Sequence, residues 1–151
     1  MKTGIDCIGI STVFFCHDNN GNFLLHKRSK NCRDEQGKWD FGGGKLEFGL
    51  TTKENVLKEI QEEYGVLGSI QKELPYYNIF RENNGMKTHW ISFPFIVEID
   101  SNKAKNNEPE NIEEIKWVKL QNLPQPLHPG VIFVLNKYKE EFENIGGKFE
   151  I

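Results

Sequence analysis

The chain has 151 residues, of which 37% are hydrophobic and 27% are charged. This composition supports one packed domain and excludes a globally disordered chain. The net charge is −3, so there is no basic excess of the kind that binds duplex nucleic acid. A small anionic substrate would instead need local cations or a metal ion. No repeat or linker divides the sequence, so we predict a single domain over residues 1–151.

The cysteines and histidines give no sign of a disulfide framework or a zinc site. Cys7, Cys16 and Cys32 are odd in number and form no Cys-x-x-Cys pair, which predicts reduced thiols. The four histidines are scattered and lack the spacing of zinc ligands. There is no secretory pattern at the start, and no apolar run approaches the roughly 18 residues of a membrane span. We therefore predict a cytoplasmic protein that does not bind membranes.

The first part of the chain predicts a hairpin followed by a polar loop. Residues 5–16 are rich in β-branched and aromatic types, which is typical of a buried strand. Residues 18–21 carry a turn signal of Asp, Asn and Gly, and residues 22–28 form a second strand. A polar loop over residues 29–38 leads into the glycine-rich segment 39–49.

Residues 51–64 predict an amphipathic helix. Thr51 and Glu54 have the spacing of a capping box, and Gly65 ends the helix. An apolar stripe follows the helical period and indicates one buried face. It consists of Val56, Leu57, Ile60 and Tyr64.

The second half of the chain predicts three more strands and a second helix. The strands cover residues 76–81, 88–99 and 114–120, and a polar loop over 101–111 separates the last two. Residues 130–143 form the helix, with apolar residues on one face. The order of two strands, a helix, three strands and a helix predicts an α/β fold with a mixed β-sheet between helices.

Three carboxylates share one face of the first predicted helix. Glu59, Glu62 and Glu63 stand at positions i, i+3 and i+4, well away from the apolar stripe. Their mutual repulsion would weaken an isolated helix, and a hard divalent cation such as Mg²⁺ or Mn²⁺ would relieve it. The alternative interpretation is a solvated acidic face. The preceding glycine run favours the metal, because glycine lets backbone approach a ligand closely.

The segment from Gly44 to Val66 resembles the Nudix box, the 23-residue motif of the Nudix (MutT-type) hydrolases. Seven box positions match: Gly44, Glu59, Ile60, Glu62, Glu63, Gly65 and Val66. Two depart, because Leu50 stands where the box has a glutamate and Lys58 where it has an arginine. The lead-in over residues 39–44 also resembles the family's, and the resemblance extends over roughly residues 5 to 140.

The resemblance implies an α/β/α sandwich and a Mg²⁺-dependent hydrolase. In that family water attacks a phosphorus atom of a nucleoside diphosphate linked to another moiety, as in a nucleoside triphosphate or ADP-ribose. Glu62 and Glu63 would hold the metal, Gly44 would be part of the same metal site, and Glu59 would be a metal ligand or the general base. A glutamate from a late loop is the base in some members, and Glu114 or the adjacent Glu113 is the candidate here.

Substrate contacts and partners are predicted less directly. Arg28 and Arg81 are candidates for phosphate contacts, although a surface position is the common alternative for an arginine. Trp39 is a candidate for the wall of the substrate cleft, with a core position as its alternative. The expected ligand is a small nucleotide, and an exposed hairpin edge would allow a homodimer.

The two departures from the box leave a second functional hypothesis open. Leu50 removes one carboxylate from the site, and Lys58 lacks the bidentate fork of arginine. Glu47 is a candidate to replace the missing carboxylate. If nothing replaces it, the chain would be a catalytically weakened Nudix-fold domain that binds or senses nucleotides.

Overall fold

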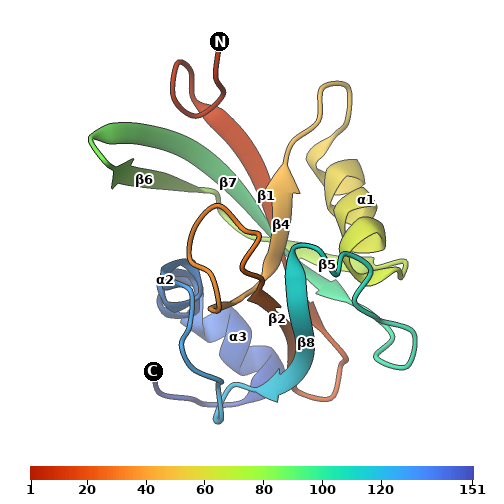
Figure 1. Ribbon diagram of the computed structural model, residues 1–151. Coiled ribbons are helices and arrows are strands. Elements are labelled where there is room, and N and C mark those ends of the chain that lie inside the picture. Colours follow the sequence, from red (N-terminus) through yellow and green to blue (C-terminus); the bar gives the residue numbers. More distant parts are fainter.

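The computed structural model describes all residues from 1 to 151 and contains eight strands and three helices (Figure 1). The strands are β1 (Gly9–His17), β2 (Asn22–Arg28), β3 (Trp39–Asp40), β4 (Gly42–Lys45), β5 (Ser69–Glu73), β6 (Tyr77–Asn83), β7 (Met86–Glu98) and β8 (Ile112–Lys119). The helices are α1 (Thr52–Tyr64), α2 (Pro129–Lys137) and α3 (Lys139–Gly146).

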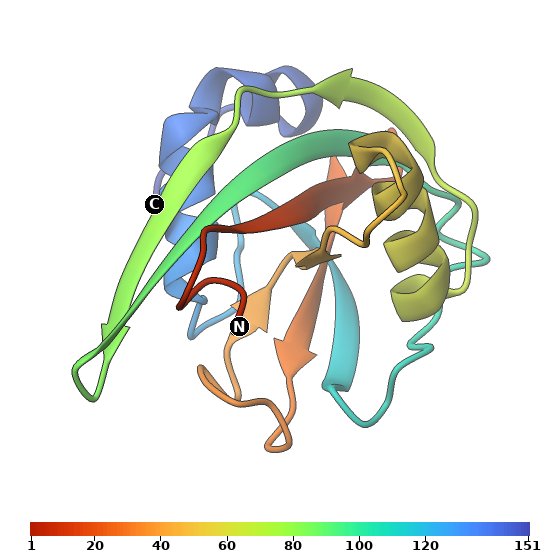
Figure 2. The ribbon, with the colours of Figure 1, turned by 90° about the horizontal axis from the view of Figure 1, so that it is seen from above.

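The strands form one mixed sheet, as predicted. Its central order is β3-β2-β1-β7-β5, while β4 pairs with β1, β6 with β7 and β8 with β2. Only β1 and β7 run parallel, and every other pair is antiparallel. Helix α1 lies on one side of the sheet, and α2 and α3 lie on the other (Figures 1 and 2). The fold is therefore an α/β/α sandwich.

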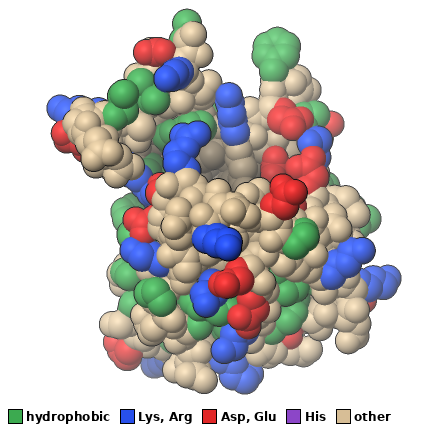
Figure 3. Space-filling model, viewed as in Figure 1, with side chains coloured by type: hydrophobic (Ala, Val, Ile, Leu, Met, Phe, Trp, Pro, Cys, Tyr) green, Lys and Arg blue, Asp and Glu red, His purple; other side chains and the backbone are tan.

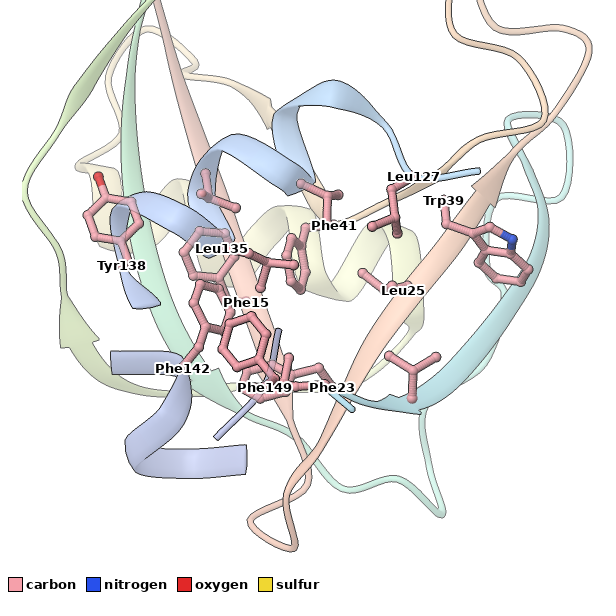
Figure 4. Packing of buried hydrophobic residues seen from close by; sticks show 14 of the residues in the cluster. Phe15, Phe23, Leu25, Trp39, Phe41, Leu127, Leu135, Tyr138, Phe142 and Phe149 are labelled. Atoms are coloured by element: carbon pink, nitrogen blue, oxygen red, sulfur yellow. The ribbon is translucent and has the colours of Figure 1, made fainter. Parts of the chain in front are cut away.

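Alternation along β1 divides the core into two layers. Successive side chains of a strand point to opposite faces, so Phe14 packs under α1 with Val56 and Ile60, and Phe15 packs under α2 and α3. The second layer is rich in aromatic rings, including Phe15 and Phe142 with centroids 4.9 Å apart (Figure 4). These two layers fix α1 against the sheet and thereby place its acidic residues.

Helix α1 begins and ends where the sequence predicts. The Thr51 hydroxyl accepts a hydrogen bond from the Glu54 amide at 3.1 Å, and the Glu54 carboxylate accepts one from the Thr51 amide at 3.0 Å. Gly65 adopts a left-handed conformation with φ 65° and donates to the Gln61 carbonyl. Both ends of the helix are thus satisfied as expected for a capping box and a C-terminal glycine.

Three predictions of local structure were wrong. Residues 5–8 are not part of β1 but of a turn, closed by a 2.7 Å hydrogen bond from the Gly4 amide to the Cys7 carbonyl. The predicted helix over 130–143 is broken at Tyr138, whose backbone leaves the helical region. The short strands β3, β4 and β5 were missed, because β3 has only two residues, β4 is mostly glycine and β5 is largely exposed without alternation.

The three cysteines are free, and none of the helices has the length and apolar character that crossing a membrane requires. The edge strand β6 and its partner β7 form a long hairpin that extends from the body of the molecule (Figure 2).

Candidate functional site

A cavity of about 730 Å³ lies between α1 and β4 on one side and β6 and α2 on the other. This volume is within the range of small-molecule sites. Figure 3 shows the hollow with Asp and Glu side chains gathered on the α1 side and Lys and Arg side chains on the opposite side. We call these the acidic end and the basic end of the cavity.

The acidic end is formed by Glu59 and Glu63 of α1 against the glycine strand β4. A Cβ at Gly44 would lie 2.5 Å from the carboxyl carbon of Glu59, and a Cβ at Gly42 would lie 3.0 Å from Oε1 of Glu63. Any side chain at these two positions would therefore displace a carboxylate. The glycine run is a packing requirement of the acidic end, and the sequence correctly indicated a close approach.

Both carboxylates are destabilised in their charged form. Glu63 is 5% exposed, and burial raises its pKa well above the ordinary value, with further repulsion from Glu108 and Glu59. Burial and repulsion from Glu62 raise the pKa of Glu59 to about 7. Neither Glu59 nor Glu63 forms a salt bridge. A cation placed between them would relieve both effects.

The donor set suits a magnesium-like ion rather than a closed protein cage. No three His, Cys, Asp or Glu side chains converge closely enough to enclose a metal. Mg²⁺, however, is usually held by one or two carboxylates and completes its shell with water and substrate phosphate oxygens. Glu59 and Glu63 supply two carboxylates at the wall of an open cavity, so the residues present fit such an ion.

Glu62 and Lys58 lie on the outer side of this acidic end. The Lys58 ammonium pairs with Glu47 at 2.9 Å and also with Glu62, so hydrogen bonds to these two carboxylates raise the lysine pKa. Glu62 does not line the cavity, yet it lies close enough to Glu59 to raise the pKa of that carboxyl. Lys58 therefore keeps the charge of the box arginine and links α1 to the loop before it.

The loop that carries Leu50 is fixed by Asn55, which is fully buried. The Asn55 amide donates to the Thr12 hydroxyl at 2.9 Å and to the Lys45 carbonyl at 3.3 Å, and its oxygen accepts from the Glu47 amide at 3.1 Å. Leu50 lies beside Glu47 and Glu59 in a second, shallower depression. Glu47 is thus the carboxylate near the altered box position, as the sequence suggested.

A glutamate that the sequence did not single out faces the acidic end. Glu108 lines the cavity and repels both Glu59 and Glu63. Its loop is tied to the end of α1, where the Asn107 amide donates to the Glu63 carbonyl at 2.9 Å, which satisfies a free helix carbonyl. The only sequence signal was the polar composition of this loop.

The two glutamates that the sequence proposed as the late base lie elsewhere. Glu114 is exposed on β8 and does not line the cavity. Glu113 forms an exposed salt bridge of 3.3 Å with Lys27. The pairing of β8 with β2 shifts register here, since Lys27 pairs with Glu114 and Arg28 with Ile112, and neither glutamate lines the cavity. Glu108 therefore replaces Glu114 as the candidate from this region.

The basic end contains both arginines that the sequence proposed, Arg28 of β2 and Arg81 of β6. Arg28 donates to Asp34 at 2.9 Å and lies 3.6 Å from Asp40. Arg81 approaches Asp34 at 3.9 Å. Asp34 thus bridges the two arginines from the loop between β2 and β3, and this bridge was not predicted.

Trp39 is a correction to the predicted site. It is 6% exposed and packs in the core layer beneath α2, and it does not line the cavity. Strand β3 pairs with β2 at this point and turns the indole inward. Trp39 therefore has the core position that was its alternative, and it is not carried forward as a substrate contact.

Two histidines also face the cavity, although the sequence gave no reason to choose them. Nδ1 of His26 forms a hydrogen bond of 2.7 Å with the Tyr64 hydroxyl. Burial lowers the pKa of His26. His128 caps α2, where its Nδ1 accepts from the Gly130 amide at 2.8 Å. Burial likewise lowers the pKa of His128, so both rings are neutral near pH 7.

Comparison with known proteins agrees with this geometry. Residues 9–136 match the NUDIX domain. An ADP-ribose pyrophosphatase of Methanocaldococcus jannaschii is 29% identical over 108 residues, which cover 72% of this chain and 60% of the relative. An RNA pyrophosphohydrolase of Erythrobacter litoralis is 28% identical over 125 residues, with 72% and 76% covered. The crystal structure of a MutT NUDIX hydrolase from Burkholderia pseudomallei superposes with a TM-score of 0.69 at 25% identity, covering 85% of this chain and 95% of that one.

The fold and the site define a MutT-type Nudix architecture. Since the family match covers most of its length, the chain belongs to the NUDIX domain family, and the resemblance noted in the sequence is confirmed. The chain spans 36%, 60% and 62% of the lengths of three of its relatives. The activity of those whole proteins is therefore carried to this chain only as a proposal.

Proposed function

We propose that this protein is a Mg²⁺-dependent hydrolase that cleaves a diphosphate bond in a nucleoside diphosphate linked to another moiety. One observation carries the proposal. Buried Glu63 and half-buried Glu59 lie against a glycine strand at the wall of an open cavity, and neither forms a salt bridge. A purely structural pair of buried carboxylates would be expected to have a counter-charge.

The residues at the acidic end divide the work. Glu63 and Glu59 would hold the metal, and Glu62 would join them if it leaves Lys58. Bound Mg²⁺ supplies charge that polarises the phosphoryl oxygens and makes a water molecule more acidic. Glu108 faces the same space from the late loop and is the candidate general base that takes the proton of the attacking water. The glycines of β4 keep this wall open to the substrate.

The substrate class follows from the cavity and from the relatives. A volume of about 730 Å³ has room for a nucleotide. Two relatives are an ADP-ribose pyrophosphatase and an RNA pyrophosphohydrolase, and both names describe cleavage of a diphosphate bond in a nucleotide derivative. We therefore propose hydrolysis of such a bridge, with Mn²⁺ as an alternative metal.

A catalytically weakened sensing domain is the second candidate, and Leu50 is the observation that favours it. Leu50 places an apolar side chain beside Glu59, where the family motif has a carboxylate. Glu47 stands close by but is held by Lys58 at 2.9 Å. Such a domain would bind a nucleotide with Mg²⁺ and turn it over slowly or not at all.

A phosphate-release assay separates the two candidates. Nucleoside triphosphates, ADP-ribose, nucleotide sugars and dinucleotides are incubated with the protein and Mg²⁺, and the products are identified. The hydrolase predicts turnover of at least one substrate that stops in EDTA and in Glu63→Gln. The matched control is Glu140→Gln, which removes an exposed carboxylate from α3 and should keep the activity. Tight nucleotide binding without turnover of any substrate would favour the sensing domain and refute the hydrolase.

A further inference from the structure

The basic end of the cavity contains hydrogen-bond donors that the protein leaves without partners. Arg81 lines the cavity and makes no hydrogen bond, and its nearest carboxylate oxygen, on Asp34, is 3.9 Å away. That distance is too long for a hydrogen bond. A guanidinium offers five N–H donors in a fixed plane, so the binding capacity of Arg81 is unused in this state.

His128 adds a third donor at the same place. Its Nδ1 accepts the Gly130 amide at 2.8 Å, so the proton of the neutral ring is on Nε2. The side chain is 6% exposed, lines the cavity, and has no partner for Nε2. Arg81 Nη2 lies 3.9 Å from the Cβ position of Gly130, which brings the arginine next to this end of α2.

Asp34 is the local anion that the two arginines now face. Its carboxylate accepts from Arg28 at 2.9 Å and lies on the loop between β2 and β3, with 41% of the side chain exposed. An ion pair this exposed is weak, because water screens it and two flexible side chains must be held in place. A phosphate group has more charge and more oxygens for two guanidinium groups, so it would compete well with one exposed carboxylate.

We propose that Arg28, Arg81 and His128 form a second anion site, which Asp34 occupies until a phosphate group of the ligand displaces it. This site deepens the proposed function, on which its choice of a nucleotide phosphate rests. A substrate would then be held at both ends of the cavity, with the attacked phosphate at Glu59 and Glu63 and a further phosphate at the basic end. Asp34 would exclude ligands that lack the second anionic group.

The charges in the cavity favour an anionic ligand over a neutral one at the basic end. With Asp34 displaced, the basic end has two permanent positive charges from its arginines, and Asp40 lies 3.6 Å from Arg28. Glu35 is the other carboxylate close enough to act on Arg81 and His128, and its charge is paired with Lys38. Asp40 also adds to the repulsion that raises the pKa of Glu63, so it lies between the two ends. In the absence of a metal, the acidic end repels anions, and the basic end is the place where they bind.

Calorimetric titration with inorganic pyrophosphate in EDTA tests the site, because this probe needs neither the metal nor a particular base. Asp34→Asn removes the competitor and should tighten pyrophosphate binding about fivefold, the equivalent of an exposed ion pair. Arg81→Gln removes an unpartnered donor and should weaken binding about tenfold, on the scale of a charged hydrogen bond. Matched charge changes outside the cavity are needed to distinguish displacement from a general change in charge, because both act in these directions.

Matched controls are Asp100→Asn and Lys119→Gln, which make the same charge changes at exposed positions outside the cavity. Both should bind pyrophosphate like the natural protein. Binding that Asp34→Asn leaves unchanged or weakens would overturn the proposal, as would binding that Arg81→Gln does not weaken. If these binding predictions fail but the protein shows Mg²⁺-dependent turnover, only the second anion site is refuted. If pyrophosphate binds as predicted but no substrate is turned over, only the hydrolase is refuted.

Discussion

At the acidic end of the cavity two carboxylates come from one helix, whereas at the basic end the donors come from three distant parts of the chain. Glu59 and Glu63 are four residues apart on α1. Arg28, Arg81 and His128 belong to β2, β6 and the start of α2. A local cluster can be read from helical spacing, while a dispersed one depends on which strands pair. The difference shows why the sequence indicated the acidic end as a cluster, whereas at the basic end it offered two separate arginines and missed His128 and Asp34.

The two ends also differ in how their charge is balanced. The acidic end has no basic partner, so its balance must come from outside the chain. At the basic end Asp34 lies 2.9 Å from Arg28 and neutralises its charge. This counter-charge belongs to the protein, and an anionic ligand can replace it. We expect the following variants and conditions to test this difference, in order from the largest effect to the smallest.

Loss of a carboxylate at the acidic end should have the greatest effect on turnover. Glu63→Gln keeps the size of the side chain but removes its charge, so the metal loses a ligand inside the cavity. We expect kcat to fall about 10²–10³-fold, on the scale of removing one electrostatic group at a reacting centre. Steady-state kinetics at saturating Mg²⁺ measures this, and a loss smaller than that from Glu140→Gln would contradict the role of Glu63.

The general base should be Glu108 and not Glu114. Glu108→Gln should lower kcat at least about 100-fold, the lower range for a general base. Glu114→Gln changes an exposed strand residue outside the cavity and should leave the rate within about twofold. Equal losses in the two variants, or the larger loss in Glu114→Gln, would reverse the assignment.

Closing the glycine wall should displace Glu59 without unfolding the protein. The Cβ of Gly44→Ala would lie 2.5 Å from the carboxyl carbon of Glu59, and misplacement of about 1 Å can cost about 10²-fold in rate. We expect kcat to fall between about 10- and 100-fold. Gly85→Ala is the control, since it has open space around it, a φ of 79° and a position in the β6–β7 turn. It should lose stability and keep its rate.

The smallest expected effect is on stability in EDTA. The raised pKa values of Glu59 and Glu63 mean that the folded state binds more protons than the unfolded state between the ordinary value of 4.5 and about 7. Their contribution to stability therefore falls as pH rises through that window. Relative to the Glu59→Gln, Glu63→Gln double variant, Tm should drop by about 2–4 °C from pH 5 to pH 7.5.

Magnesium ions supply the control for the stability measurement. Added Mg²⁺ binds the folded state and should restore Tm at pH 7.5 in the natural protein but not in the double variant. A relative Tm that rises with pH in EDTA would show that the two carboxylates are stabilised by a partner within the protein.

The predictable part of the fold was the part with strong local periodicity. The limits of α1 followed from Thr51, Glu54 and Gly65, and the mixed sheet followed from the order of elements. The break at Tyr138 could not be read from the sequence, because a continuous apolar face runs through it. Its hydroxyl donates to the Pro75 carbonyl, a contact between residues far apart in the chain. Strand β4 has almost no side chains, so its pairing is set by the packing of Glu59 and Glu63.

The same limit applies to the site. Trp39 and Glu114 were chosen by residue type near a motif, but strand register turned one into the core and the other to solvent. Glu108 and Asp34 lie on polar loops, where sequence gives composition and no direction. Their positions depend on the hydrogen bonds of the Glu108 loop to the end of α1 and on the pairing of Asp34 with Arg28.

Paramagnetic broadening by Mn²⁺ in NMR spectra of the protein tests the central claim most directly, because it locates the metal without any substrate. At substoichiometric Mn²⁺, the amide signals of Gly43, Gly44 and Glu63 should broaden first, and those of Arg28 and Arg81 should broaden less. The Glu59→Gln, Glu63→Gln double variant should lose the broadening at the glycines. Broadening centred at another surface, or unchanged in that variant, would contradict a metal site at the acidic end.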